Sequence, residues 1–266
     1  MSELIRGSHP EVANKKSTRA RIKRVNQEHL GTGLTEGTVH RVDVEVIGAE
    51  GKIRTIPMAE KMFDNSDMDE TAKQASIAKI LAIHHGLLER GLPTIPTMRT
   101  EKGNNNILMT DLTHQNKNEV VSLPDWAKGK ERSEKYADTE HKTEITNLDE
   151  ISNSLATIFE QSVATGCKIN MADAFFFVID KENKKSNVLL ADLAEIEFVD
   201  VSDVTEREKL ADHNYETILQ FVRGMRSHIQ SDQKFSMDPI LKKKREFREM
   251  FKKLQKEAKD DRPDTT

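Results

Sequence analysis

Apolar and polar residues alternate over residues 30–63, and this pattern predicts β-strands early in the chain. Four valines between residues 39 and 46 fall close to every second position, and GAEGK at 48–52 is typical of a hairpin turn. The apolar residues of 53–62 then predict the return strand. Together these segments indicate an antiparallel sheet.

A helical spacing of apolar residues takes over next and predicts one long helix over 68–90. Capping and acidic residues in DNSDMDE at 64–70 favour its start, and the glycine and prolines of RGLPTIP at 90–96 favour its end. Its expected inner face carries Ile77, Leu81 and Leu88. A turn, KGNNN at 102–106, then leads into a short predicted strand, ILMTDL at 107–112.

The second half of the chain predicts helices and one hairpin. The apolar run of residues 175–193 is interrupted by KENKKSN at 181–187, which predicts two paired strands. Helices are expected at 148–166, 205–230 and 241–262, the last of them heavily charged. Because strands come early and helices late, the sequence predicts an α+β fold.

Changes in composition divide the chain into five segments. Residues 1–29 are polar and basic, and we expect a flexible or loosely docked arm there. Clustered charges over 113–147 indicate an inserted loop or a helical excursion at a lobe boundary. The other three segments are a β-rich N-lobe at 30–112, a helical C-lobe with the hairpin at 148–232, and a charged C-terminal helix and tail at 233–266.

Composition narrows the class of protein. Of the 266 residues, 32% are charged, and the net charge of −4 argues against a dedicated nucleic-acid binder. The single cysteine, Cys167, excludes an internal disulfide and fits a reducing cytoplasm. No apolar run approaches the roughly 20 residues that cross a bilayer. We therefore expect a cytoplasmic protein; export without a cleaved signal and the oligomeric state stay open.

Two neighbouring segments of the predicted sheet carry residues suited to phosphate binding. Gly31, Gly33 and Gly37 lie between strands, where backbone amides can approach phosphate oxygens, although an ordinary glycine-containing turn has the same pattern. Lys61 follows in the apolar strand MAEKMF, where a buried ammonium needs a carboxylate or phosphate partner unless it faces a sheet edge. Glu70 is a candidate partner for Lys61, or an acid favoured there by the helix dipole.

Two aspartates flank the predicted hairpin. Asp192 ends VLLAD, where its carboxylate can hold a metal–phosphate complex or cap a turn. Asp173 lies before the first strand, where it can bind a metal, accept a proton from a substrate hydroxyl or serve as a turn residue. His84 and His85 lack the spacing of metal ligands and are expected to be structural.

In this order the segments resemble the protein-kinase-like superfamily, above all its small bacterial and aminoglycoside-phosphotransferase-like members, over roughly residues 28–225. GTGLTEGTV is similar to the glycine-rich loop, MAEK with Lys61 to the lysine strand, and ADLAEI with Asp192 to the DFG segment, with alanine in place of its glycine. The GLPTIP helix exit and the hinge strand ILMTDL complete the resemblance. It implies a two-lobed fold that uses ATP and Mg²⁺, with the backbone from Met109 to Asp111 against adenine.

The stretch before the hairpin departs from that family's pattern. GCKINMADAFFF contains no histidine–x–aspartate motif. If Asp173 replaces the catalytic-loop asparagine, Lys168 stands at the catalytic aspartate position; if Asp173 is the catalytic acid, Val178 stands where the asparagine is expected. One expected acid or metal ligand is missing in either alignment.

The sequence therefore supports three hypotheses about function. The first is an ATP- and magnesium-dependent phosphotransferase that acts on a hydroxyl group of a protein or small molecule. The second is a catalytically impaired, nucleotide-binding pseudokinase that acts as an interaction module, and the third is an α+β domain with an accidental resemblance. For the first, the proposed residues are Asp173 and Lys61 in catalysis, Gly31, Gly33, Gly37, Lys61, Met109 and Asp111 for the nucleotide, and Asp192 and Asp173 for the metal.

Overall fold

A computed structural model describes most of the chain from residue 19 to residue 260. The described ranges are 19–23, 29–33, 37–47, 52–63, 67–100, 105–113, 117–122 and 142–260. The tip of the glycine-rich hairpin and most of the charged segment after residue 122 lie outside them.

The N-terminal part is a six-stranded sheet in which the paired strands are antiparallel. Its strands are β1 (Arg19–Lys23), β2 (His29–Gly33), β3 (Gly37–Ile47), β4 (Ile53–Met62), β5 (Thr97–Arg99) and β6 (Asn106–Thr110). The order is β1-β3-β4-β6-β5, and β2 also pairs with β3. The long β3–β4 hairpin is the one that the alternating valines predict. The first 18 residues of the expected basic arm lie outside the described ranges, and Arg19–Lys23 form β1, which pairs with β3.

One long helix, α1 (Glu70–Glu89), follows the sheet as predicted. Asp69 caps its start, since its Oδ1 accepts a hydrogen bond of 2.7 Å from the Ala72 amide. The buried apolar face is formed by Ile77, Ile80, Ile83 and Leu87. The predicted inner face is therefore wrong at Leu88, which is 55% exposed, because it lies about 100° around the helix from Leu87.

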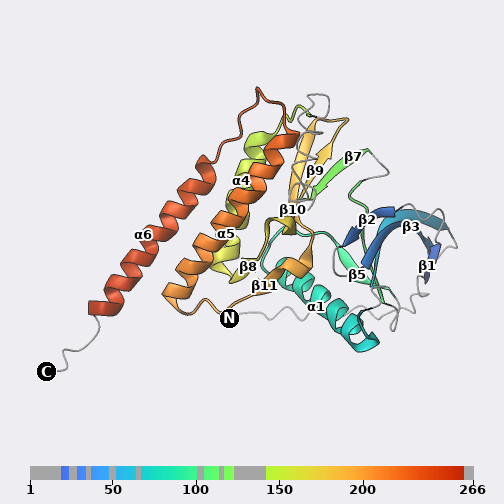
Figure 1. Cartoon of the computed structure of the whole chain (residues 1–266), viewed down its shortest axis with the longest axis horizontal. Helices are drawn as coiled ribbons and strands as arrows, with labels where there is room; N and C mark the ends of the chain where they lie inside the picture. Colours follow the sequence, from blue (N-terminus) through green and yellow to red (C-terminus); the bar gives the residue numbers. More distant parts are fainter. Residues whose placement is uncertain are drawn as a thin grey trace, which may run out of the picture.

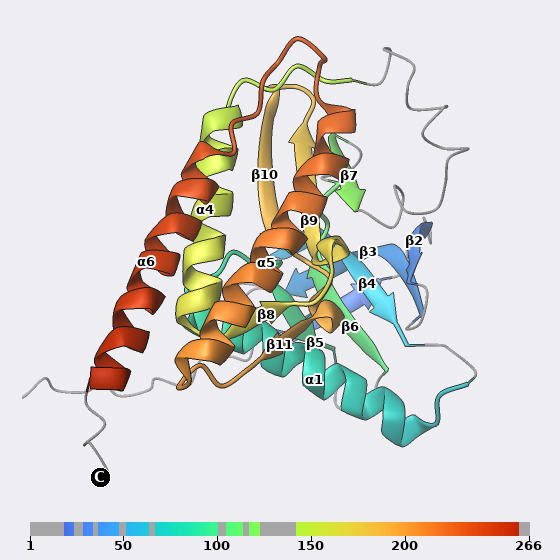
Figure 2. The same cartoon turned by 60° about the vertical axis from the view of Figure 1, so that its left-hand side comes forward.

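The C-terminal part contains three long helices and the predicted hairpin, whose arrangement can be followed in Figure 1. Its elements are α4 (Leu148–Ala164), β8 (Cys167–Ile169), η2 (Ala172–Ala174), β9 (Phe175–Asp180), β10 (Lys185–Leu190), η3 (Leu193–Glu195), β11 (Ile196–Phe198), α5 (Val204–Met225), η4 (Arg226–His228) and α6 (Asp238–Asp260). Figure 2 shows α4, α5 and α6 side by side, and Figure 1 shows the hairpin between these helices and the N-terminal sheet. The two-part α+β layout expected from the sequence, strands early and helices late, is confirmed.

The charged segment 113–147 contributes a strand that its composition does not predict. β7 (Asn118–Ser122) pairs with β9, so that the hairpin becomes a three-stranded sheet of order β10-β9-β7. The strand was missed because Glu119, Val120 and Val121 give too short an apolar pattern among many charges. The hairpin turn is also shorter than predicted, since β10 already begins at Lys185.

One hydrophobic cluster runs through both parts of the molecule. It joins Phe63, Ile107 and the buried face of α1 to the inner face of the hairpin and to α4 and α5. In its centre Phe175 and Phe221 stack with their ring centroids 4.9 Å apart. A second, smaller cluster of Val42, Val44, Met58 and Leu108 lies on the opposite face of the N-terminal sheet.

The chain between α1 and β5 attaches the hairpin to the N-terminal sheet. The Leu190 amide donates to the Pro93 carbonyl at 3.0 Å, and the Leu190 carbonyl accepts from the Ile95 amide at 3.2 Å and from the Thr94 hydroxyl at 3.0 Å. The next residues form β5, which pairs with β6. Residues 93–95 therefore connect the end of β10 to the edge strand β5 of the N-terminal sheet.

A tight turn after α4 gives a test of this packing. Gly166 has a φ of +71°, and a Cβ placed there would lie 2.3 Å from the Val199 carbonyl oxygen. We expect Gly166→Ala to lower the free energy of unfolding by about 2–4 kcal/mol, because it combines left-handed backbone strain with a backbone clash. Gly91→Ala is the matched control, since its φ is +66° but the nearest atom would be 3.6 Å away. Urea unfolding of both variants measures the difference; equal losses would contradict the clash.

Candidate nucleotide and phosphoryl-transfer site

The three candidate glycines lie on one hairpin of the N-terminal sheet. Gly31 pairs with Val39, and Gly33 pairs with Gly37 next to the turn between β2 and β3. Gly37 has a φ of +126°, which side-chain-bearing residues rarely adopt. The turn itself, residues 34–36, lies outside the described residues, so the described part establishes a glycine-flanked hairpin and not its phosphate contacts.

Lys61 lies on the strand next to that hairpin. Its cross-strand neighbours are Val39 on β3 and Ile107 on β6, so it belongs to an interior strand and not to a sheet edge. The side chain is half-buried, and its Nζ lies 5.6 Å from the centre of the Phe63 ring. Ile107 and Phe63 both belong to the large cluster, so Lys61 shares the sheet face that is directed towards the C-terminal part.

Asp173 and Asp192 come together at the base of the β9–β10 hairpin. Phe175 pairs with Leu190, and the Ala174 carbonyl accepts from the amides of both Ala191, at 2.9 Å, and Asp192, at 3.4 Å. The hairpin thus places the backbones of two acids that are 19 positions apart against each other. Asp192 also caps η3, where its Oδ1 accepts a long hydrogen bond of 3.4 Å from the Ala194 amide.

The Asp173 carboxylate has an unsatisfied oxygen. Its Oδ1 is shielded from solvent and has no hydrogen-bond partner among the described residues. Burial raises the pKa of Asp173, while the amides of Asp173 and Ala174 act in the opposite direction with smaller effect. A shielded carboxylate oxygen without a donor is costly for the fold alone, and it is suited to receive a metal ion or a proton.

The raised pKa of Asp173 predicts how the free energy of unfolding depends on pH. Between the unfolded value of about 3.9 and the higher folded value the native state binds more protons, so the unfolding free energy falls as pH rises. We expect Asp173→Asn to stabilise the protein by roughly 0.5–1 kcal/mol above the folded pKa, a modest gain because nearby solvent screens the charge. The gain should disappear below about pH 4.

Urea unfolding between pH 4 and pH 8 measures this difference. Asp232→Asn, at an exposed aspartate on the loop before α6, is the control and should be neutral throughout. A pH-independent effect of Asp173→Asn would contradict the stated cause.

The strand expected to act as a hinge ends in a buried ion pair. Met109 lies in register with Ala59 on one side and Thr97 on the other, inside the sheet. Asp111 follows the strand and is 6% exposed. Its Oδ2 accepts from Arg41 Nε at 3.0 Å, which links the exit of β6 to β3. No local pattern in the sequence points to Arg41 as the partner of Asp111, because the two residues lie 70 positions apart.

Glu70 is the first residue of α1 and is exposed. Its Oε2 accepts a hydrogen bond of 2.7 Å from Asn105 Nδ2, and its Oε1 accepts one of 3.3 Å from Gln74 Nε2. These contacts and its place in the first turn agree with the helix-dipole alternative, because an acid is favoured there without any lysine partner.

Lys168, which stands at one candidate position of the missing catalytic aspartate, has a structural partner. Its Nζ lies 2.6 Å from Glu197 Oε1 and ties β8 to β11. An ammonium group in this pair cannot accept a proton. Of the two alignments of this stretch, only the one that makes Asp173 the catalytic acid keeps a carboxylate at that position.

The described residues contain no ready-made metal cage of three or more histidine, cysteine or acidic side chains. Magnesium often binds through one or two carboxylates, with phosphate oxygens and water completing its shell. Asp173 and Asp192 fit that donor set, since both are hard oxygen ligands and Asp173 Oδ1 lacks a partner in the described structure.

Within the described residues, no helix is long and apolar enough to pass through a bilayer.

Of the two mid-helix histidines, His84 has the structural role that the sequence predicts, while His85 is exposed. His84 is buried, and its Nε2 accepts a hydrogen bond of 3.3 Å from the Thr97 amide. Burial, and secondarily the neighbouring His85, lower the pKa of His84. The neutral ring attaches α1 to the start of β5, which is a structural role.

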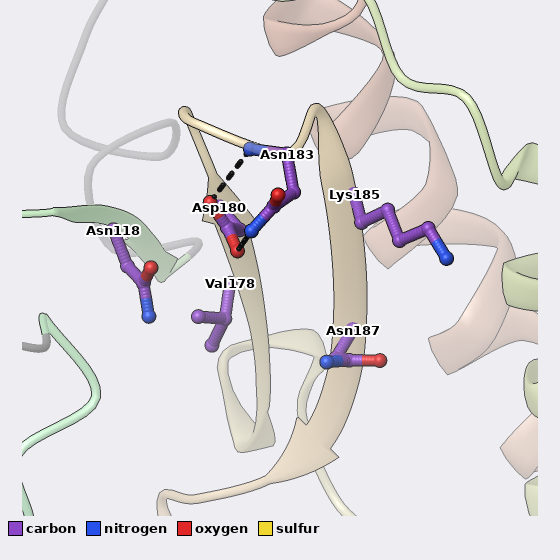
Figure 3. Close-up of a pocket in the computed structure, with 6 residues that line it drawn as sticks. All are labelled: Asn118, Val178, Asp180, Asn183, Lys185 and Asn187. Carbon is purple, nitrogen blue, oxygen red and sulfur yellow. Dashed lines mark hydrogen bonds between the residues drawn. The ribbon is translucent and has the colours of Figure 1, made fainter.

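A separate hollow of about 550 Å³ lies at the other end of the hairpin (Figure 3). It is lined by Asn118, Val178, Asp180, Asn183, Lys185 and Asn187. Asp180 is the last residue of β9, and its carboxylate accepts from the amides of Glu182 and Asn183, both at 3.0 Å. Because Asp173 precedes the first residue of the same strand, this hollow is separate from the acid pair.

No protein-family model matches the chain, and no curated protein matches its sequence. Among solved structures, the crystal structure of the Rio2 kinase–ADP/Mg²⁺–phosphoaspartate complex from Chaetomium thermophilum matches with a TM-score of 0.41 and 13% sequence identity. The match covers 89% of this chain and 72% of that chain. So distant a likeness concerns the fold at most and carries no argument about what this chain binds.

Proposed function

We propose that this chain binds ATP between its N-terminal sheet and the base of the β9–β10 hairpin and transfers the γ-phosphoryl group to a hydroxyl. The proposal is carried by the closeness of the Asp173 and Asp192 backbones, since the carbonyl of Ala174, the residue after Asp173, accepts from the Asp192 amide. Two acids at one end of the hairpin, one with a shielded and unsatisfied oxygen, suit a metal–phosphate site better than a purely structural turn.

The N-terminal sheet supplies the second half of the proposed site. The glycine-flanked hairpin and Lys61 lie on adjacent strands, and Lys61 lies on the face directed towards the C-terminal part. In this assignment Gly31, Gly33 and Gly37 let the backbone approach the phosphates, and the ammonium of Lys61 neutralises them. The exit of β6, from Met109 to Asp111, would contact the base.

Each residue then has a defined part in the reaction. The acceptor oxygen forms a bond to the γ-phosphorus while the bond from that phosphorus to the β–γ bridging oxygen breaks, and ADP leaves. Asp192 would hold Mg²⁺, which offsets phosphate charge when it is bound. Asp173 would either serve as a further ligand of that ion or take the proton of the acceptor hydroxyl on its carboxylate. Most of the catalysis is positioning and charge stabilisation.

A second function, nucleotide binding without turnover, is favoured by one observation. If Asp173 replaces the catalytic-loop asparagine, the position of the catalytic aspartate holds Lys168, which is paired with Glu197. A chain that kept the phosphate and metal residues but lacked an effective base would bind Mg-ATP and serve as an interaction module. Proton removal contributes about 10²–10⁴-fold to such reactions, so turnover would fall by that factor.

Thermal unfolding with Mg-ATP tests the proposal and separates the two functions. At roughly 100 times its Kd, a ligand stabilises the folded state by about 2.7 kcal/mol. For a chain of this size we expect the Tm to rise by about 5–10 °C. ATP hydrolysis, with water as the acceptor, then reports turnover. A shift with hydrolysis supports the phosphotransferase, a shift alone supports the binding module, and no shift overturns both.

A further inference from the structure

A buried polar cluster joins β3 to the exit of β6. Asp111 Oδ1 accepts from the Thr113 amide at 3.0 Å and from the Thr113 hydroxyl at 2.6 Å. Its Oδ2 accepts from Arg41 Nε at 3.0 Å, and Arg41 Nη2 donates to the Thr113 hydroxyl oxygen at 2.6 Å. We call Arg41, Asp111 and Thr113 the clasp.

The clasp is shielded from water, so burying its charges costs free energy that its contribution to folding stability does not by itself explain. The side chains of Arg41 and Asp111 are 14% and 2% exposed. Desolvating two charges costs about as much as their attraction returns, and apolar residues of similar volume often serve the fold equally well. What the clasp contributes is a fixed geometry. The planar guanidinium of Arg41 donates to both Asp111 and Thr113 and so holds the segment after β6 in one orientation.

The clasp lies on the same sheet face as the proposed phosphate ligand. Arg41 pairs with Ala59, and Val39, two residues earlier on β3, pairs with Lys61. Because residues two apart on a strand share a face, Arg41 and Lys61 point to the same side of the sheet. Ala59 also pairs with Met109, so the hinge strand, the clasp and Lys61 form one continuous surface.

We propose that Arg41 and Thr113 are positioning residues for the nucleobase: by gripping Asp111 they hold the exit of β6 in the orientation that receives the base. This inference rests on the proposed function. It assigns the recognition of the base to the clasp and that of the phosphates to Lys61. Weakening the clasp should therefore reduce affinity for ATP and leave affinity for inorganic tripolyphosphate, which has no base, unchanged.

Calorimetric titration of the full chain with Mg-ATP and with Mg-tripolyphosphate tests this division. Wild type should bind Mg-ATP more tightly than Mg-tripolyphosphate. Arg41→Gln should weaken Mg-ATP by about tenfold or more, as expected for charge-assisted hydrogen bonds, and change Mg-tripolyphosphate by less than about twofold. Arg41→Lys should not restore ATP affinity, since a lysine cannot reproduce the fork.

Thr113 provides a milder pair of variants in case Arg41→Gln does not fold. Thr113→Val removes the shared hydroxyl but keeps the Arg41–Asp111 pair, and Thr113→Ser keeps the hydroxyl. We expect the valine variant to lose Mg-ATP affinity by about three- to tenfold and the serine variant to match wild type. Equal loss of both probes, or unchanged preference for ATP, would overturn the positioning role. Binding of neither probe by wild type would instead overturn the proposed function.

Discussion

Asp192→Asn should reduce magnesium-dependent ATP hydrolysis by about 10³-fold, which corresponds to roughly 4 kcal/mol of transition-state stabilisation. The amide keeps the size of the carboxylate and an oxygen that can still cap η3 through the Ala194 amide. It removes the negative charge that a magnesium ion requires. Hydrolysis rates at saturating Mg-ATP, together with the Tm of the variant, measure the effect.

The matched control for this substitution is Asp232→Asn, at the exposed aspartate on the loop before α6. It should leave hydrolysis and Tm at wild-type values, because surface substitutions of this kind are nearly neutral. Wild-type turnover in Asp192→Asn, with the fold intact, would refute the metal-binding role of the carboxylate.

The second large effect is expected at Lys61. Lys61→Met keeps the length and apolar stem of the side chain, so the strand pairing is preserved, while the contact of Nζ with the Phe63 ring is lost with the ammonium. It removes the ammonium, and we expect kcat/KM for Mg-ATP hydrolysis to fall by about 10²–10³-fold. Because the charge contacts the phosphates, affinity for Mg-tripolyphosphate should fall as well.

Lys79→Met serves as the control for Lys61, since Lys79 is an exposed lysine of α1. Its turnover and affinities should equal those of wild type. If Lys61→Met bound Mg-tripolyphosphate as tightly as wild type, the assignment of Lys61 to the phosphates would be refuted, whatever its rate of hydrolysis. The two probes also separate Lys61 from the clasp, which should affect ATP alone.

Local signals made most of the secondary structure predictable. The alternating valines of β3, the Asp69 cap and glycine–proline stop of α1, and the two apolar runs of the β9–β10 hairpin each depend on residues close in sequence. The closeness of the Asp173 and Asp192 backbones follows from the hairpin, whose two strands are predicted from local sequence.

Features that depend on distant partners were not predictable. β7 is held by its pairing with β9 rather than by its own pattern, and Arg41 and Asp111 are 70 positions apart. Leu88 fits a helical repeat but lies outside the buried face, which is decided by what α1 packs against. In each case tertiary contacts override local preference.

The continuity of the large cluster has a consequence for how the chain can be divided. Phe63, Ile107 and the inner side of α1 contribute to the same apolar interior as the hairpin and the C-terminal helices. Separating the N-terminal sheet from the C-terminal helices would expose a hydrophobic surface on each fragment. Neither fragment would be a free-standing domain, so deletion experiments would report aggregation rather than the role of the missing half.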